Sequence, residues 1–305
     1  MPRDHTMPFD VQPDLPATMD IQIPALAWQP TGAGWQRTYY LDGRQIPVEV
    51  REGADSLVFR FDAPPTTQTR LEQILADTFT VPVAALALTA SPILSAIADE
   101  YRGVVVMGAS PFEALVITIL SQNRTGEIVR TVYPRLAARC HGITPETVAA
   151  VPVDELGELI RSAGPYKAPR LHQTAATIAE EGEAAFDAIV CGPDQKALDY
   201  LVSLPGVAHK TAACVLTFAG GCTSTLPVDT HLFRVVDRLG LARHDGRNTP
   251  ANRDQLISTL LAYGPDLAPA HFLFLLLGRT TCVSGTPRCR DCFLAGLCPS
   301  MEPQP

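Results

Sequence analysis

The sequence predicts a mainly α-helical protein with a small antiparallel sheet near its start and a cysteine-rich loop near its end. Three observations support this fold class. Apolar residues recur at helical spacing through most of the chain from about residue 91 onward. Between residues 38 and 61, short alternating segments flank an Asp-Gly turn pair. Four of the eight cysteines crowd into the last quarter of the chain.

The N-terminal third carries the strand signals. Residues 1–35 are proline-rich, and we expect a loosely ordered lead-in. RTYYL and RQIPVEV flank Asp42-Gly43, which favours a hairpin over residues 38–50. LVFRF alternates apolar and basic residues, which predicts a third strand over residues 56–61. Short helices are then expected over residues 66–80 and 83–89.

The remainder of the chain is predicted to be helical. The helix at 111–121 begins with Ser110-Pro111, a good cap and first-turn pair, and has Glu113 in its first turn. The other helices are expected over residues 92–101, 126–138, 153–163, 168–181, 195–204, 209–218, 233–239, 252–263 and 270–277.

Length, composition and charge limit the class of protein. The 305 residues leave room for two or three domains. No apolar run approaches the roughly 18 residues of a membrane span, and the start of the chain does not resemble a signal peptide. We therefore expect a cytoplasmic protein without disulfides. Four scattered cysteines are expected to be small buried hydrophobic residues, namely Cys140, Cys191, Cys214 and Cys222.

The net charge of −8 argues mildly against a nucleic-acid partner. Its distribution weakens that argument. Residues 1–110 carry 7 basic and 13 acidic side chains, residues 111–195 carry 7 and 11, and residues 196–305 carry 10 and 8. The small positive excess in the last third predicts weak non-specific DNA affinity with a shallow salt dependence.

The stretch LPGVAHKTAACVLTFAGGCTSTLPVD, residues 204–229, is the most informative. Pro205-Gly206 marks a tight turn between two helices. Free N–H groups and the dipole at the start of the second helix favour an anion such as phosphate. Lys210 in its first turn is unfavourable for the helix, but the same field favours the neutral amine that a nucleophilic lysine needs. Asp229 could supply a nearby negative charge; an ordinary helical hairpin with a solvated lysine is the alternative.

The cysteine-rich loop has the chemistry of a metal site. Cys282, Cys289, Cys292 and Cys298 are spaced C-x6-C-x2-C-x5-C. Four soft thiolates suit zinc or an iron–sulfur cluster. Structural zinc sites commonly use two close cysteine pairs separated by a longer loop. One close pair flanked by two single cysteines favours a [4Fe-4S] cluster, with zinc as the alternative.

These motifs together resemble a known family. LPGV-x-x-KTA at 204–212 and VDTH-x-FRV at 228–235 are similar to the helix-hairpin-helix and following loop of the endonuclease III family of DNA glycosylases. The cysteine spacing resembles the [4Fe-4S] loop of that family. The resemblance covers about residues 110–298 and implies a two-lobed helix-hairpin-helix fold. It implies a cluster domain of residues 91–110 and 225–305, a hairpin-bearing bundle of residues 111–224, and an N-terminal extension of residues 1–90 with the small sheet.

The resemblance also implies an activity. It is that of a base-excision repair enzyme acting on double-stranded DNA: a bifunctional glycosylase that removes oxidised pyrimidines and cleaves 3′ to abasic sites by β-elimination. Lys210, on the bundle side, would form a Schiff base with the sugar. Asp229, on the cluster side, would stabilise the oxocarbenium-like sugar and help to deprotonate Lys210. For Asp229 a helix N-cap is the bland alternative.

Further positions match the DNA-binding parts of that family. Gln122 in LSQN resembles the glutamine that fills the gap left by an extruded nucleotide, although a helix-terminal Gln-Asn pair is usually a cap. His231 is expected to be structural, and Tyr166 and Lys167 to form a turn near the cleft. The predicted DNA-binding residues are Gln122, Asn123, Leu204, Gly206, Ala208, His209, and Arg288 and Arg290 of the cluster loop.

The hairpin departs from the family pattern. Family hairpins usually read G-V-G, whereas this chain has Gly206-Val207-Ala208. A methyl group on Ala208 would narrow the approach of a phosphate or forbid a positive φ. Ala208→Gly is therefore expected to strengthen DNA binding. The segment VSGTPR of the cluster loop has a single basic residue, which favours weak activity or an unusual substrate.

Three rival functions stay open. A mismatch-adenine glycosylase would lack the lysine. A glycosylase for oxidised purines or alkylated bases is suggested by the β-rich N-terminal part, which is similar in arrangement to 8-oxoguanine and alkyladenine glycosylases. A cluster-containing DNA-binding protein without catalysis is the third. We expect a monomer with no membrane partner.

Overall fold

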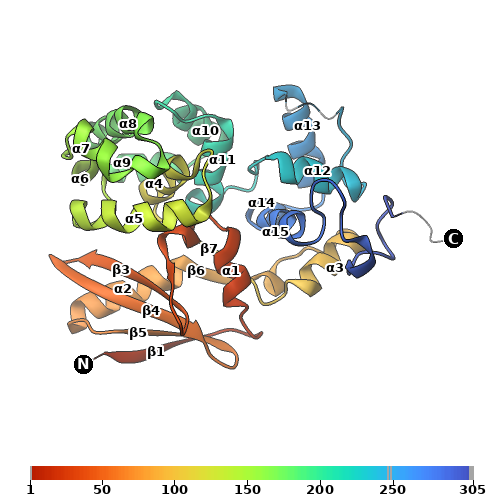
Figure 1. Cartoon of the computed structure of the whole chain (residues 1–305), viewed down its shortest axis with the longest axis horizontal. Coiled ribbons are helices and arrows are strands. Elements are labelled where there is room, and N and C mark those ends of the chain that lie inside the picture. The colour runs from red at the N-terminus through yellow and green to blue at the C-terminus, as the bar shows by residue number, and fades with distance from the viewer. Residues whose placement is uncertain (1, 246, 248, 302–305) are drawn as a thin grey trace.

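A computed structural model describes residues 2–245, 247 and 249–301. Its N-terminal part holds a five-stranded antiparallel sheet of order β1-β5-β4-β3-β2 (Figure 1). The predicted hairpin is present: Asp42 and Gly43 both have positive φ, at 52° and 71°, which suits a two-residue turn that matches strand twist. The strands are β1 (Arg3–Pro8), β2 (Gln29–Pro30), β3 (Trp35–Leu41), β4 (Arg44–Glu52) and β5 (Ser56–Phe61).

The expected loose lead-in over residues 1–35 is wrong. It contains β1, which pairs with β5 along its whole length, and β2. It also contains helix α1 (Leu15–Ile21) and the 3₁₀ turn η1 (Pro24–Ala27). Gln22 is fully buried and fixes this segment, because its amide accepts from Met107 N at 2.9 Å and donates to Val105 O at 2.7 Å. These partners lie more than 80 residues away along the chain.

A short linking region joins the sheet to the helical part. Helix α2 (Pro65–Thr78) is close to its predicted range. The helix expected over 83–89 is wrong, since the chain forms only the 3₁₀ turn η2 (Val83–Ala85). Two unpredicted strands, β6 (Phe79–Pro82) and β7 (Val105–Met107), pair with each other around α3 (Pro92–Glu100).

The middle of the chain is a helical bundle built around α4 (Pro111–Ser121). Residues 111–120 of this helix are all buried, which explains their almost uninterrupted apolar sequence. The helix packs on α5, α9 and α11. Helices α6 and α9 were not predicted. The bundle elements are α4, α5 (Gly126–Cys140), α6 (Pro145–Ala149), α7 (Val153–Leu159), η3 (Arg161–Ala163), η4 (Pro165–Lys167), α8 (Ala168–Glu181), α9 (Glu183–Val190), α10 (Asp194–Ser203), α11 (His209–Val215) and the π-helical segment η5 (Leu216–Gly220).

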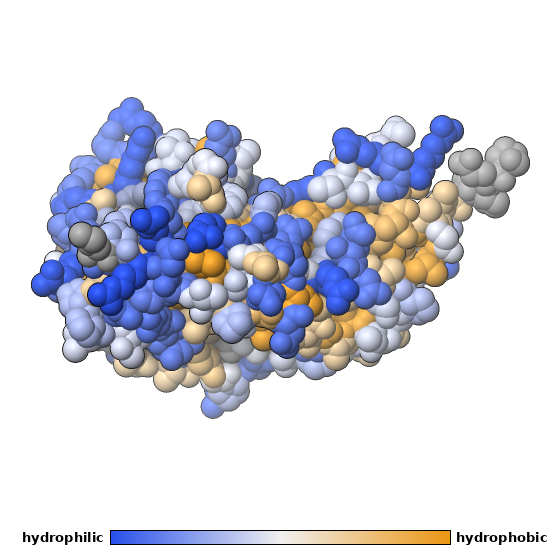
Figure 2. Space-filling model, turned by 90° about the horizontal axis from the view of Figure 1, so that it is seen from below, coloured by the Kyte–Doolittle hydropathy of each residue, from blue (hydrophilic) through white to orange (hydrophobic). Residues whose placement is uncertain are grey.

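The last part of the chain forms a second helical group, on the right of Figure 1. Helix α3 from the N-terminal region lies with it. Seen from below, hydrophobic side chains gather toward this group, while the sheet end of the molecule is mostly hydrophilic (Figure 2). Its elements are α12 (Thr230–Arg238), α13 (Pro250–Leu261), α14 (Leu267–Ala270), α15 (Phe272–Thr280) and η6 (Cys289–Asp291).

Two hydrophobic cores underlie this arrangement. One joins the sheet to the bundle and runs without a break from Trp28 and Phe59 to Phe112 and Phe186. The other joins α3 to α12–α15 and reaches Leu294 in the cysteine loop. The sheet and the bundle thus share one core. The division into residues 1–90, 111–224, and 91–110 with 225–305 stays a prediction.

Within the described residues, none of the helices has the length and apolar character needed to cross a membrane.

Candidate active site and cluster loop

The hairpin between α10 and α11 is a tight turn anchored on the bundle. Gly206 has φ +79°, a left-handed conformation that favours glycine, and a Cβ there would also press on Arg170 Cδ at 3.1 Å. Thr174 Oγ1 donates to Pro205 O at 3.1 Å. Ala208 is exposed and extended, with φ −96° and ψ 169°. The expectation that its methyl group forbids a needed positive φ is therefore wrong. The methyl group can only narrow the approach of a phosphate on the exposed side of the turn.

Lys210 lies in the first turn of a continuous helical rod made of α11 and η5. Its side chain is 56% exposed, while residues 211–216 behind it are buried. A flexible side chain therefore projects from a rigid base. The π-helical end of the rod is of a kind often found near functional sites.

Asp229 caps α12 and faces Lys210 at the same time. Its Oδ1 accepts from the backbone N–H groups of His231 and Leu232, both at 2.9 Å. Its Oδ2 lies 3.9 Å from Lys210 Nζ, and the side chain is 19% exposed. The two predicted roles of Asp229 are thus compatible in geometry, because the cap uses one oxygen and leaves the other toward the amine. Lys210 lies on α11, which packs in the first core. Asp229 immediately precedes α12, which packs in the second core, so the pair spans the two cores.

Gln122 ends α4 beside the hairpin. Its Nε2 donates to Gly206 O at 3.1 Å and to Thr211 Oγ1 at 3.0 Å. Asn123, the next residue, has φ +55°, a conformation in which asparagine is enriched. The structure therefore brings the predicted wedge residue, the hairpin and the start of the Lys210 helix into direct contact.

The other predicted DNA-binding residues are more dispersed. Leu204 is buried beneath the hairpin at 5% exposure, so it supports the turn. The His209 side chain lines a separate groove with Asp194 and Asp254, and burial lowers its pKa. Arg288 and Arg290 are exposed on the cysteine loop, with no side-chain ion pair among the described residues.

The four clustered cysteines line a single small cavity of about 80 Å³, together with Leu277 and Leu294. Burial raises the pKa of Cys292, and the negative charges of the three other thiolates add to this effect. Within the described ranges, no three His, Cys, Asp or Glu side chains surround one point as a single ion would require. Four thiol side chains around one cavity are ligands that suit zinc or an iron–sulfur cluster.

Two arginines that the sequence analysis missed connect α12 to this loop. Arg234 donates to Cys282 O at 3.1 Å, to Gly278 O at 2.8 Å, and contacts His231 Nδ1 at 3.1 Å. Arg238 Nη1 lies 3.5 Å from Cys282 Sγ and donates to Val283 O at 2.8 Å. Their i, i+4 spacing in FRVVDR was the available signal, since it puts both on one helix face.

The scattered cysteines are buried with one exception. Cys140, Cys214 and Cys222 are buried as expected, but Cys191 is exposed. It follows directly on α9, an unpredicted helix, and its Sγ lies 3.6 Å from Ala219 O. The expectation for this cysteine was therefore wrong.

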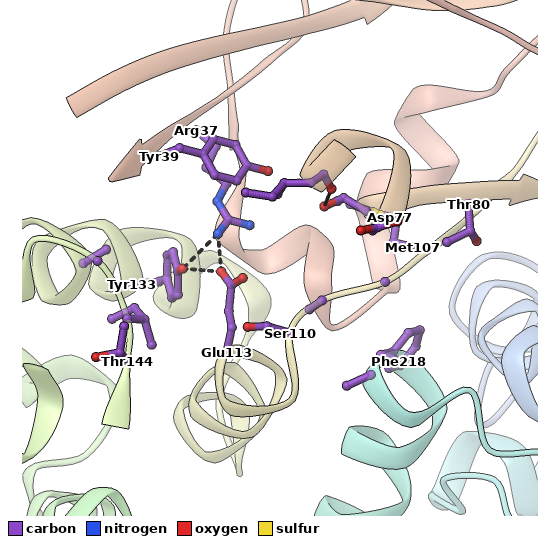
Figure 3. A pocket seen from close by; sticks show the side chains of 18 of the residues that line it. Arg37, Tyr39, Asp77, Thr80, Met107, Ser110, Glu113, Tyr133, Thr144 and Phe218 are labelled. Carbon is purple, nitrogen blue, oxygen red and sulfur yellow. Dashed lines mark hydrogen bonds and ion pairs between the residues drawn. The ribbon is translucent and has the colours of Figure 1, made fainter. Parts of the chain in front are cut away.

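A cavity of about 730 Å³ lies between the sheet and the bundle (Figure 3). Ser110 and Glu113 at the start of α4 line it, as does Phe218 near the end of the α11–η5 rod. Gln122 and Lys210 stand at the opposite ends of these two elements, so the cavity is separate from the Lys210–Asp229 pair.

A buried ion pair stands at the wall of this cavity. Arg37 on β3 donates to Glu113 and, at 3.3 Å, to the Tyr133 hydroxyl. Burial opposes the charge on Arg37, but Glu113, Tyr133 and Tyr39 together outweigh it, so the pKa of Arg37 is raised. The pair ties the sheet to α4.

Comparison with known proteins decides the family. Residues 116–262 match the family described as HhH-GPD superfamily base excision DNA repair protein. Endonuclease III of Synechocystis sp. is 35% identical over 197 residues, which cover 63% of this chain and 83% of that protein. The chain belongs to the endonuclease III family.

Solved structures agree with this membership. An endonuclease III–DNA complex, non-covalent by its description, is 30% identical, with a TM-score of 0.55 over 68% of this chain and 93% of that one. The 3-methyladenine DNA glycosylase from Archaeoglobus fulgidus has a TM-score of 0.70 over 90% of this chain and 99% of that one, at 19% identity. The likeness to the 3-methyladenine DNA glycosylase concerns the fold alone. Because it covers 90% of this chain, it includes most of the first 90 residues. The family and fold predicted from the sequence are confirmed, and the protein is a base-excision DNA glycosylase and abasic-site lyase by class.

Proposed function

We propose that this endonuclease III family member is a bifunctional glycosylase that removes oxidised pyrimidines from duplex DNA through a Schiff base on Lys210. One observation carries the proposal: Lys210 Nζ is exposed and lies 3.9 Å from Asp229 Oδ2. An exposed ion pair alone contributes little to stability. An amine beside a carboxylate at the start of a helix is, however, the arrangement that a lysine nucleophile needs.

Access to the base comes first. A base stacked in a duplex is out of reach of a side chain, so the nucleotide has to be extruded. In the proposal the backbone N–H groups at the start of α11, next to Gly206 and Ala208, hold a phosphate beside the target. Gln122, which already touches the hairpin, supplies the wedge for the gap in the stack.

Bond breaking follows at C1′. As the glycosidic bond breaks, its electron pair leaves with the base, and the positive charge that develops on the sugar is stabilised by the carboxylate of Asp229. The neutral amine of Lys210 forms a bond to C1′, and loss of its protons with ring opening gives the Schiff base. The imine makes the 2′ proton acidic. When this proton is removed, a C2′–C3′ double bond forms, and the C3′–O bond breaks with its electrons leaving on the 3′ phosphate. The cap bonds to Oδ1 keep the carboxylate oriented throughout.

The lysine content narrows the choice of nucleophile. The chain has three lysines, Lys167, Lys196 and Lys210. Lys167 is only 3% exposed, and its amine is engaged by two carbonyl groups. Lys196 is exposed on α10 and forms no ion pair with a carboxylate among the described residues. Lys210 alone combines exposure with a facing carboxylate, which supports its role.

The four cysteines fit a resident [4Fe-4S] cluster, and we include it in the proposal. Cys282, Cys289, Cys292 and Cys298 would hold it, and when bound it supplies structural cross-linking of the loop. The loop would then present Arg288 and Arg290 to the DNA backbone. Measured iron and sulfide near four per protein would support this, and zinc in their place would contradict it.

The substrate is the least constrained part. The N-terminal sheet and the fold likeness leave oxidised purines or alkylated bases as the second candidate. Duplexes that each carry one defined lesion would separate the two, and we expect excision of oxidised pyrimidines. Excision confined to purine lesions would overturn the substrate assignment. We further propose that the protein acts as a monomer in the cytoplasm.

Borohydride trapping tests the Schiff base on Lys210 directly. Borohydride reduction on abasic duplex DNA traps a Schiff base as a stable adduct. The adduct is expected with the wild type and with Lys196→Ala, and is expected to vanish with Lys210→Ala. Absence of an adduct with every form would overturn the Schiff-base step of the proposal.

A further inference from the structure

Lys167 is a buried cation with an unusual pair of partners. It ends η4, is 3% exposed, and its backbone N–H donates to Gly164 O at 3.1 Å. Its Nζ donates to Leu120 O at 2.9 Å and to Gln122 O at 2.7 Å. Both carbonyls belong to the end of α4, where a helix leaves C=O groups without intrahelical partners and carries partial negative charge. A cation from a distant turn thus completes the end of the central helix.

Contacts from outside its own helix hold Gln122 at its main-chain carbonyl and at its side chain. Lys167 binds its main-chain carbonyl from the bundle side. The hairpin binds its side-chain amide, through Gly206 O and Thr211 Oγ1. A wedge residue has to release the second contact in order to enter the DNA stack. The contact with Lys167 and the bond from the Gln122 N–H to Ile119 O at 3.3 Å can both stay in place while it does so.

We propose that Lys167 is a positioning residue for base extrusion, which fixes the main chain of Gln122 while its side chain leaves the hairpin for the DNA. This inference rests on the proposed function, because the wedge role of Gln122 belongs to it. Lys167 itself reaches neither DNA nor the sugar, since its amine is enclosed and occupied.

The neighbouring charges agree with this role. Burial, with a smaller contribution from Arg124, lowers the pKa of Lys167 to about 8. Arg124 is turned outward, where it donates to Ser162 O at 3.1 Å and to Asn123 O at 3.0 Å. The chain just after Gln122 is therefore fastened on the same side, which leaves the glutamine side chain as the part free to move.

Lys167→Met tests the inference, because it keeps the length of the side chain and removes both hydrogen bonds. Excision of a base-paired lesion is expected to slow about 100-fold, as small misplacements of positioning groups do. Borohydride trapping on a preformed abasic site is expected to change by less than about threefold, because that site has no base to extrude. Gln122→Ala should show the same split. The double variant should lose little more than either single one, since both act on one step. Lys196→Met, an exposed matched control, should stay within about twofold in both assays.

Fluorescence of 2-aminopurine placed beside the lesion reports extrusion directly, and its rise should be lost in Lys167→Met but kept in Lys196→Met. If Lys167→Met does not fold, Lys167→Gln, which keeps N–H donors on a shorter side chain without the charge, takes its place, with a smaller split in the same direction expected. Equal losses in excision and trapping, or no loss of excision, would overturn the inference. A wild-type protein that neither excises nor traps would instead overturn the proposed function.

Discussion

The two oxygens of Asp229 make its roles separable by mutation. Asp229→Asn keeps a side-chain oxygen for the N–H groups of His231 and Leu232 but removes the charge that faces Lys210. Asp229→Ala removes both the cap and the charge. Comparison of the two variants therefore tells a helix cap from a catalytic carboxylate.

The size of each effect follows from the geometry. Unit charges about 4 Å apart interact by about 1 kcal/mol in water and about 4 kcal/mol at an effective dielectric constant of 20. Because the Asp229 side chain is 19% exposed, its interaction energy with the positive charge on the sugar should lie between these two limits. That range corresponds to rate losses of about fivefold to 1000-fold, and we expect about 100-fold for Asp229→Asn. Loss of the cap in Asp229→Ala should cost about 1 kcal/mol of unfolding free energy, or about 2 °C in Tm.

Single-turnover excision and calorimetry measure the two effects on the same samples. Asp229→Asn should be about as stable as the wild type but slow, whereas Asp229→Ala should be slow and less stable. If Asp229→Asn kept the wild-type rate within about threefold, the carboxylate would be a cap only, and the catalytic reasoning would be refuted.

Three further predictions concern the hairpin, the sheet and the second core. Ala208→Gly should tighten duplex binding only modestly, by about threefold in fluorescence anisotropy, because the backbone at Ala208 is already relaxed; unchanged affinity would contradict this prediction. Arg37→Met should lower the unfolding free energy in urea by about 3–5 kcal/mol, since it leaves the buried Glu113 without its cationic partner. A cost below about 1 kcal/mol would show that this pair does not tie the sheet to α4. Burial lowers the pKa of His271 to about 4, whereas an unfolded histidine titrates near 6.5. The unfolded chain therefore binds the proton first as pH falls, and about 3 kcal/mol of stability should be lost between pH 6.5 and 4. His271→Leu should abolish that part of the pH dependence in urea titrations, and an unchanged slope would contradict the assignment.

Local sequence signals were sufficient for the hairpin, the Asp-Gly turn and the start of α4. Each depends on residues within one or two turns of chain, such as Pro205-Gly206 or Ser110-Pro111. The family followed because its two motifs and its cysteine spacing are also short. Those are the parts of this protein in which local preference and final structure agree.

Long-range partners explain what was missed. The first 35 residues were expected to be loosely ordered because β1 finds its partner in β5, and Gln22 finds its own in β7. The positions of Lys167 and Arg238 are likewise set by carbonyl and thiol groups some 45 residues away. No periodicity near Lys167 marks its contacts, so its interpretation as part of a turn was the natural one. The i, i+4 spacing of Arg234 and Arg238 marks a shared helix face, but not the loop that this face contacts.

Mapping the borohydride-trapped adduct is the most direct test of the chemistry assigned to this chain. Protease digestion and mass spectrometry of the wild-type complex on abasic DNA would locate the sugar remnant on one residue. The account predicts a remnant on Lys210. A remnant on Lys167, on Lys196 or on the N-terminal amine, or no remnant at all, would contradict it.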